Sequence, residues 1–498
     1  MTHRARHLIT GQLVAESALH VGASRSDAVT DLPVLRDGSG RPLLPGTSLA
    51  GVLRRTLPDD EADRWFGSHD GSTTHPSVVI VDDAPATGGT YERHGTQIRT
   101  TTAIDPRTGA VKERLLFSRE VVPQGTIFSL SLELETDDEA SAEEFLQRLA
   151  GTLATGIRVG AAITRGLGRV SLDGDLERRT IALQERERFL DFLSDVDHRS
   201  PVTPASAVTE PRSLMFALPF VPVGPLMTSV ELPGGAVDRV PLTAPTEAGH
   251  VRLTLPGSSI KGALRARALY LLGTLGKSAD DPAFVTLFGA AAELDEERRQ
   301  LGRRGRLIVE DSGVDTPIPA EKWQAVLDAS GQEAPRARKA LTTALSDLAS
   351  DSLPRFIPAD RVAVDRWTGG AAEPLLYSLL EPHHHTEEWE PLRLTLDLDG
   401  VPDDEARRAV GLLLMVLREV RDGWVKFGYG TRRGLGQVRL AEGKDDISVG
   451  ESLAGWFPLR DWRITGKEQP PQAVDDALEA FIQSPSDATS LLSTQEDS

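Results

Sequence analysis

The chain has 498 residues, a formal net charge of −19 at pH 7 and no cysteine. This length can supply two domains that each bury a core of their own. The lack of cysteine excludes disulfides, thiolate metal sites and a cysteine nucleophile. The acidic balance argues against nucleic-acid binding through the whole surface but leaves room for a local basic groove. No apolar run reaches the roughly 20 residues that span a bilayer, and the N-terminus lacks the apolar core of a signal peptide, so we expect a cytoplasmic protein with no membrane partner.

Six sequence blocks occur twice, in the same order, along the chain. The first copy contains LPGTSLAGVLRR (44–55), WFG (65–67), VVIVDDA (78–84), TAIDPRTGAV (102–111), FSLSLELETDDEA (128–140) and GAAITRGLGRVSL (160–172). The second copy contains LPGSSIKGALRARA (255–268), LFG (287–289), LIVEDSG (307–313), VAVDRWTGGA (362–371), PLRLTLDLDGVPDDEA (391–406) and GYGTRRGLGQVRL (428–440). Six matches in order, at a spacing far above that of solenoid repeats, indicate that one whole domain is duplicated.

Hydrophobic periodicity predicts the same elements in each copy. Apolar residues alternate in FSLSLELE (128–135) and LRLTLDLD (392–399), which is the pattern of a half-buried strand. Amphipathic helices are predicted at 139–154 and 404–420, each followed by a glycine-rich loop and a last strand. Because a strand (7–18 in the first copy) and a helix come first, the full order is strand, helix, hairpin-like middle, strand, helix, strand. This order predicts an α+β protein of two tandem ferredoxin-like (RRM-like, βαββαβ) domains.

Changes of composition mark the expected domain boundaries. We expect a first domain at 1–182 and a linker at 183–212, where proline, serine and threonine replace periodicity. A second domain is expected at 213–442, with a largely helical insertion at about 314–357. Residues 443–498 then form an extension whose polar end is expected to be disordered.

The two glycine loops are candidate phosphate-binding segments, because glycine allows positive φ and arginine supplies charge. The residues concerned are Gly160, Arg165, Gly166, Gly168 and Arg169 in the first copy, and Gly428, Arg432, Arg433, Gly434 and Gly436 in the second. A tight turn with solvent-facing arginines is the alternative. The P-loop pattern GxxxxGK[ST] does not occur, which excludes that type of nucleotide triphosphatase.

The PGTS and PGSS blocks predict helix starts, with Thr47 or Ser48 and Ser258 or Ser259 as N-caps. Free amides at such helix ends bind phosphate. In the second copy Lys261 and Arg265 lie four residues apart on one helix face and could follow an RNA backbone. In the first copy, Ala50 replaces the lysine and Arg54 is retained.

The middle blocks of both copies predict hairpins with basic or aromatic bends. Arg107 lies at the first bend, and Arg366 with Trp367 lies at the second. Such side chains can wedge against stacked bases. A hairpin tip without a partner is the alternative.

One loop in each copy carries a candidate catalytic carboxylate. SRSDAVTDLPVLRD (24–37) contains Asp27, Asp31 and Asp37, and GGAVDRVPLTAP (234–245) contains Asp238. A loop carboxylate beside a phosphodiester can hold Mg²⁺ or assist proton transfer from a ribose 2′-hydroxyl. Aspartates that only form turns are the alternative.

Together these motifs resemble the RAMP superfamily of CRISPR-associated proteins, and most closely the backbone subunits of type III effector complexes. The resemblance rests on LHVG (19–22), DLPVLRD (31–37), the PGTS and PGSS helices, the bends and the RGLG loops. It implies a protein that binds CRISPR RNA together with other effector subunits, and inserts thumb hairpins near 104–111 and 364–371 into the guide–target duplex. It also implies that a loop aspartate cuts target RNA with a divalent metal such as Mg²⁺ and the 2′-hydroxyl as nucleophile.

Carried over by position, the resemblance implies that Asp31 is the catalytic and metal-binding residue of the first copy and that Asp238 is its counterpart. The second loop departs from the family pattern, because its proline is displaced by one residue and the basic–acidic pair is missing. Three alternatives stay open: a structural RNA-binding subunit that does not cut, a guide-precursor processing nuclease, and a protein that binds no RNA. A processing nuclease usually needs a histidine near the glycine loop, and His20 is the nearest candidate.

Overall fold

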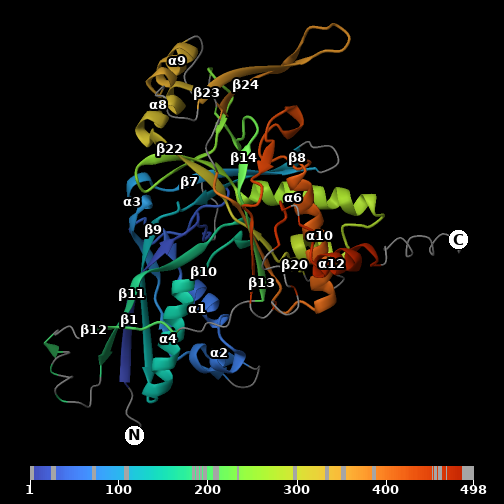
Figure 1. Ribbon diagram of the computed structural model, residues 1–498. Coiled ribbons are helices and arrows are strands. Elements are labelled where there is room, and N and C mark those ends of the chain that lie inside the picture. The colour runs from blue at the N-terminus through green and yellow to red at the C-terminus, as the bar shows by residue number, and fades with distance from the viewer. Residues whose placement is uncertain are drawn as a thin grey trace. The chain divides into compact units, whose positions relative to one another are not determined.

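The computed structural model describes residues 5–23, 30–69, 74–105, 111–181, 186, 190, 193–194, 199–205, 212–232, 235–294, 300–330, 336–348, 355–383, 389–450, 453, 457, 462–466 and 468–484. These residues form two compact units. The first unit comes mainly from the N-terminal 209 residues and the second mainly from residue 210 onward (Figure 1). Both units combine helices and antiparallel strands, which confirms the predicted α+β class.

The first unit is built on an antiparallel sheet around β1 (Ala5–Ala15). Its neighbours are β9 (Thr126–Thr136) on one side and β11 (Arg169–Ile181) on the other. Beyond β9 lie β5 (Val79–Val81) and β6 (Ala84–Gly89). The strand order is therefore β11, β1, β9 and then β5 with β6. Shorter strands in this unit are β2 (Leu43–Leu44), β3 (Ser68–His69), β4 (Thr74–His75), β10 (Ile157–Arg158) and β12 (Arg199–Pro201).

Alternation along β9 builds the core of the first unit, as the sequence predicts. Phe128, Leu130, Leu132 and Leu134 are all buried, and α4 (Glu139–Thr155) packs on the sheet through Leu146 and its neighbours. Each such side chain contributes about 1.5–3 kcal/mol through burial. Further helices in the described part of this unit are α1 (Gly46–Arg54), α2 (Asp59–Phe66) and α3 (Thr90–His94).

The second unit repeats the strand order of the first. The strand β13 (Ser213–Leu218) lies between β25 (Leu392–Asp397) and β27 (Asp446–Val449), and β21 (Leu307–Val309) lies beyond β25. A short continuation, β14 (Phe220–Pro222), pairs with β26 (Val438–Leu440). Thus β26 and β27 together occupy the place of β11, and β21 occupies that of β5.

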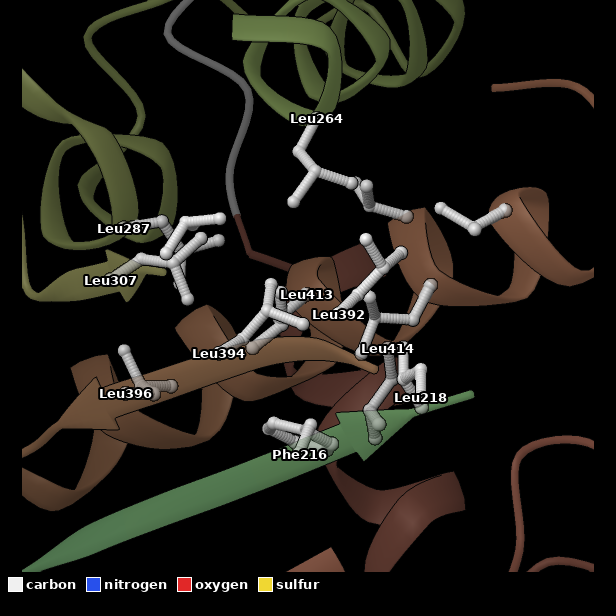
Figure 2. Packing of buried hydrophobic residues seen from close by; sticks show 14 of the residues in the cluster. Phe216, Leu218, Leu264, Leu287, Leu307, Leu392, Leu394, Leu396, Leu413 and Leu414 are labelled. Carbon is white, nitrogen blue, oxygen red and sulfur yellow. The ribbon is translucent and has the colours of Figure 1, made fainter. Parts of the chain in front are cut away.

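Leucine and phenylalanine side chains from strands and helices meet in the core of the second unit (Figure 2). Phe216 of β13 and Leu394 of β25 face Leu413 of α10 (Asp403–Arg421). The helices α6 (Gly257–Thr274) and α7 (Pro282–Phe288) add Leu264 and Leu287.

The second unit continues past residue 442, where the repeated pattern leads us to expect its end. β27 adds an edge strand to the sheet by pairing with β13, and α12 (Gln472–Ile482) packs on α10. The two helices approach closely at Gly411, where a Cβ would lie only 2.2 Å from the carbonyl oxygen of Ala477. Phe457 and Phe481 are fully buried in the same core. The predicted disordered end, residues 485–498, lies outside the described residues.

Each unit carries a two-stranded hairpin in the position of the repeated middle block. These are β7 (Gln97–Ile104) with β8 (Val111–Val121), and β23 (Arg355–Val364) with β24 (Ala371–His383). The predicted insertion contains the helices α8 (Ala320–Ser330) and α9 (Arg336–Leu348) (Figure 1). Both helices contribute to a hydrophobic cluster that includes Trp323. Further strands are β15 (Ser229–Glu231), β16 (Arg239–Pro241), β17 (Thr243–Pro245), β18 (His250–Leu255), β19 (Gly289–Leu294), β20 (Gln300–Arg304) and β22 (Ser312–Pro319).

Among the described helices, none has the length and apolar character needed to cross a membrane.

Replacing Phe128 with alanine should reduce the free energy of unfolding of the first unit by about 3–5 kcal/mol, because it leaves a cavity in the centre of the sheet. Glu135→Ala, on the exposed end of the same strand, should change that energy by less than about 0.5 kcal/mol. Denaturant unfolding curves of the two variants measure the difference. Equal effects would contradict the burial pattern of β9.

Candidate nucleic-acid interface

Asp31 is exposed and is bound by one residue of β8. Its Oδ2 accepts hydrogen bonds from the backbone N–H of Ser118 at 2.7 Å and from the Ser118 hydroxyl at 3.0 Å. The same hydroxyl accepts a hydrogen bond from the Asp31 N–H at 3.0 Å. The Ser118 backbone N–H, and then its hydroxyl, hold the pKa of the Asp31 carboxyl below its usual range. Asp31 is therefore an anion at neutral pH, and its Oδ1 accepts no hydrogen bond from a described residue.

Asp238 is held in the same way in the second unit. Its Oδ2 accepts from the N–H of Ser378 at 2.6 Å and from the Ser378 hydroxyl at 3.1 Å. The residue after each aspartate forms a parallel bridge with the residue after each serine: Leu32 with Arg119, and Arg239 with Leu379. The two aspartates are thus structurally equivalent, although the sequences around them differ.

The basic–acidic pair that follows Asp31 shapes its loop. Arg36 forms an ion pair with Glu120, whose carboxylate also accepts a hydrogen bond from the N–H of Val34 at 2.7 Å. Asp37 accepts from the backbone N–H groups of Ser39 and Arg41, both at 2.9 Å. Since these residues bond to the loop and to β8 rather than to Asp31, their absence after Asp238 does not remove the aspartate–serine contact. Asp27 lies outside the described residues.

The predicted N-caps of the PGTS and PGSS helices are wrong. The helices begin at Gly46 and Gly257, after Pro45 and Pro256, and no cap side chain accepts a hydrogen bond. The reason is that a carboxylate from a neighbouring segment takes the first free amide. Those carboxylates, with their partners, are Asp83 for Gly46 and Asp311 for Gly257, each at 2.8 Å.

The same glycines bring each helix start against a strand. A Cβ on Gly46 would lie 2.0 Å from the carbonyl oxygen of Val81, and one on Gly257 would lie 2.1 Å from that of Val309. Only glycine allows this approach. Ser48, Ser258 and Ser259 therefore lie in the first turn of their helices and do not cap them.

Several of the predicted RNA-binding cations contact the protein itself. Arg54 forms an ion pair with Asp63 and donates to the carbonyls of Ala62 and Gly67. Arg169 forms an ion pair with Glu16. In both cases the acidic partner comes from a segment that the sequence patterns did not connect with the arginine.

The cations on α6 are similarly engaged. The ammonium of Lys261 donates to the carbonyl of Leu307 at 2.6 Å, and burial lowers the pKa of Lys261 to about 7. The guanidinium of Arg265 lies 5.2 Å from the ring centre of Phe284, and burial lowers its pKa. The spacing of the two residues on one helix face agrees with the exposed position of Arg265, but it did not predict that Lys261 binds a backbone carbonyl.

All the predicted loop glycines have positive φ. Gly160, Gly166 and Gly168 lie at 87° to 88°, and Gly428, Gly434 and Gly436 lie at 78° to 89°. Glycine is required at Gly436, since a Cβ there would lie 2.0 Å from the carbonyl oxygen of Phe427. Each loop contains a short 3-10 turn, Ile163–Arg165 with Arg165 or Thr431–Arg433 with Arg432 and Arg433, while Arg169 begins β11.

Two tyrosines, which the sequence analysis did not identify, place Arg433 beside β24, the strand whose Ser378 donates to Asp238. The Arg433 guanidinium lies 5.1 Å from the ring centres of both Tyr377 and Tyr429 and donates to the Tyr377 hydroxyl. Tyr377 directly precedes Ser378, and Arg239 lies 5.2 Å from the ring of Tyr429. The GYG sequence (428–430) of the second loop contains Tyr429 and could have indicated an aromatic contact for Arg433.

The tip of the β23–β24 hairpin presents an indole to solvent. The Trp367 side chain is 97% exposed, next to the exposed Arg366. Asp365 forms the turn by accepting from the N–H of Trp367 at 3.0 Å and of Thr368 at 2.8 Å. An aromatic ring held at a tight turn is suited to stacking on a base. Arg107, at the other predicted bend, lies outside the described residues.

No described part of the chain gathers three or more histidine, aspartate or glutamate side chains as metal ligands. A cation at Asp31 would therefore rely on one carboxylate, water and the phosphates of a bound RNA. Magnesium suits such a site, because it is commonly held by one or two carboxylates plus substrate phosphates.

Two segments, residues 12–171 and 235–439, match the family model of the RAMP superfamily. The chain therefore belongs to the RAMP superfamily, with one match in each sequence copy. Among characterised proteins it is similar to the CRISPR system Cms endoribonuclease Csm3 of Methanocaldococcus jannaschii, at 25% identity over 197 residues, which covers 34% of this chain and 79% of that protein. It also matches a chain of the cryo-EM structure of type III-B Cmr-beta in the apo state, at 17% identity and a TM-score of 0.30, over 33% of this chain and 96% of that chain.

Replacing Asp83 with alanine should lower the free energy of unfolding by about 0.5–2 kcal/mol, because the first amide of α1 loses its acceptor. Asp83→Asn keeps an acceptor oxygen and should retain most of that energy. Denaturant unfolding of both variants checks this, and equal losses would show that Asp83 does not act as the cap.

Proposed function

We propose that the chain is a CRISPR RNA-binding backbone subunit of a type III effector complex, made of two fused copies, and that it cuts target RNA paired with the guide. Its partners would be CRISPR RNA, target RNA and other effector subunits. Membership of the RAMP superfamily and similarity to an endoribonuclease named Csm3 support this proposal. The observation that carries the cleavage step is the repeated pair of an exposed aspartate and a serine, Asp31 with Ser118 and Asp238 with Ser378.

Each copy is proposed to be a ferredoxin-like domain with a thumb hairpin. The strand order β11, β1, β9, β5 in the first unit supports this topology, as does its repetition around β13 in the second. The proposed thumbs are the β7–β8 and β23–β24 hairpins, whose tips would separate or stack on base pairs of the guide–target duplex.

The glycine loops are proposed to hold RNA phosphates through backbone amides and through Arg165, Arg432 and Arg433. Arg54 and Arg169 would have to exchange an intramolecular carboxylate for a phosphate, so their share of the binding should be smaller. The helix starts at Gly46 and Gly257 each have their first amide occupied by a carboxylate, and the amides of Ser48 and Ser259 donate to the carbonyls of Pro45 and Pro256. Ser48, Ser258 and Ser259 would therefore contact phosphate through their hydroxyls.

The proposed reaction transfers a phosphoryl group to the neighbouring 2′-oxygen. The bond between phosphorus and the 2′-oxygen forms, the bond to the 5′-oxygen of the next nucleotide breaks, and that oxygen takes up a proton. Asp31 contributes a fixed anion with one open oxygen, which orients the 2′-hydroxyl and favours removal of its proton. A divalent cation such as Mg²⁺, held by Asp31 and by RNA phosphates, would neutralise phosphate charge.

The double variant Asp31→Asn, Asp238→Asn should bind target RNA as tightly as the wild type but cut it at least about a hundredfold more slowly, because general acid–base groups contribute about 10²–10⁴-fold. The assay uses the complex purified with its RNA, Mg²⁺ and end-labelled RNA complementary to the co-purified guide. Products should carry a 2′,3′-cyclic phosphate and a 5′-hydroxyl.

The matched control for this experiment is Asp175→Ala, which removes an exposed aspartate of β11 and should leave the rate unchanged. If the wild-type complex binds the RNA and leaves it intact, the chain is a non-cutting scaffold. If the purified complex contains no RNA, the RNA-binding proposal itself is wrong.

Trp367→Ala should weaken binding of the guide–target duplex by about 1–3 kcal/mol, which is the usual range for loss of one base–aromatic stack. Trp367→Phe should restore most of the affinity. Trp424 is also exposed, at 68%, but lies outside the hairpin, so Trp424→Ala serves as the control. Filter-binding titrations at fixed salt measure the three affinities, and equal losses for Trp367→Ala and Trp424→Ala would contradict a role of the hairpin tip.

A further inference from the structure

We infer that Ser118 and Ser378 are positioning residues for RNA cleavage, each fixing the orientation of its catalytic aspartate. This inference rests on the proposed function, since it assumes that Asp31 and Asp238 cut. It adds two residues, on strands far from the aspartates in the sequence, that neither the loop motifs nor the glycine loops indicate.

The geometry around Asp31 is that of a two-way clamp. The Ser118 hydroxyl donates to Oδ2 of Asp31 and accepts from the N–H of the same residue, at 3.0 Å in both cases. The Ser118 backbone N–H adds a second donor to Oδ2, at 2.7 Å. Because all these bonds from the serine engage one carboxylate oxygen and the aspartate backbone, they fix the side-chain torsion and leave Oδ1 available.

The second unit contains the same clamp in a different sequence context. Ser378 gives Oδ2 of Asp238 two donors, its N–H and its hydroxyl, and the Asp238 N–H lies 3.2 Å from that hydroxyl. The loops that carry the two aspartates share little else in sequence, since DLPVLRD (31–37) aligns with DRVPLTA (238–244). Retention of this one contact in both copies is what a functional constraint on the aspartate would produce.

The strands that carry the serines contain a further internal repeat. LLFS (115–118) in the first copy corresponds to LLYS (375–378) in the second. Beyond this point the strands diverge, because Arg119 and Glu120 correspond to Leu379 and Leu380. The serine is therefore a polar residue that both strands keep directly before they diverge.

A purely structural clamp would use these bonds to fasten the hairpin to the loop. The backbone already does this, since the N–H of Leu32 donates to the Ser118 carbonyl at 3.2 Å and the N–H of Asp238 donates to the Ser378 carbonyl at 3.0 Å. The serine hydroxyl adds little to that fastening. Its distinctive contribution is to the carboxylate, which it holds in one orientation.

Other side chains on the loop do not replace the serine hydroxyl. Asp37 and Arg36 face other partners on this loop, Arg41 and Glu120.

The test uses the purified complex with Asp238→Asn as background, so that only the first site cuts. Ser118→Ala should lower the single-turnover cleavage rate about tenfold, which corresponds to the loss of one hydrogen bond to a charged group. RNA affinity should stay within about twofold. Ser118→Thr, which keeps the hydroxyl, should restore the rate, and Ser129→Ala on β9 is the matched control.

Three results would overturn the inference or its basis, and they can be told apart. A Ser118→Ala complex with the parent rate would show that the serine does not position Asp31. A loss of rate that matches a loss of RNA affinity and is not rescued by threonine would show a structural role instead. If Asp31→Asn in the same background still cuts, the proposed function of Asp31 is wrong, and the inference falls with it.

Discussion

Each candidate aspartate depends on the hydrogen bonds that join its loop to the second strand of the neighbouring hairpin. Without them, Asp31 and Asp238 would be surface carboxylates on irregular loops, with no fixed orientation. The bonds place each carboxylate at the base of the hairpin that precedes β9 or β25 in the chain. The hairpin strand therefore supplies the support that orients the aspartate.

The duplicated sheet can form twice because the two copies retain the same close contacts. Gly46 and Gly257 allow the first helix to start directly against a strand, and Asp83 and Asp311 accept its first amide. These contacts need particular residues, so they persist while the intervening loops and insertions diverge. The surface is freer to change, and the second copy has gained Tyr377 and Tyr429 around Arg433 where the first has Phe117 and Ala161.

Much of the fold could be predicted from the sequence because its patterns are local. Alternating leucines identify β9 and β25, and the amphipathic segments after them identify α4 and α10 within two residues of their ends. β27 could not be expected from the duplication, since the first copy completes the same edge with the single long strand β11.

The candidate site was harder to predict, because its contacts join distant segments. The aspartates stand out in loops, but their serine partners lie in apolar strands and look like ordinary strand residues. The same difficulty explains why Arg54 and Lys261 look like RNA-binding cations in sequence while contacting Asp63 and the Leu307 carbonyl in the structure. An acidic chain of net charge −19 offers many such acceptors, so an arginine or lysine at helical spacing says little about a nucleic-acid partner.

The most direct test of the central claim, two equivalent cutting sites in one chain, is a cleavage map of guide-complementary RNA at single-nucleotide resolution. The wild-type complex should give two sets of cuts, Asp31→Asn should remove one set and Asp238→Asn the other. Cuts whose positions and amounts do not change in either variant would contradict the assignment of both aspartates.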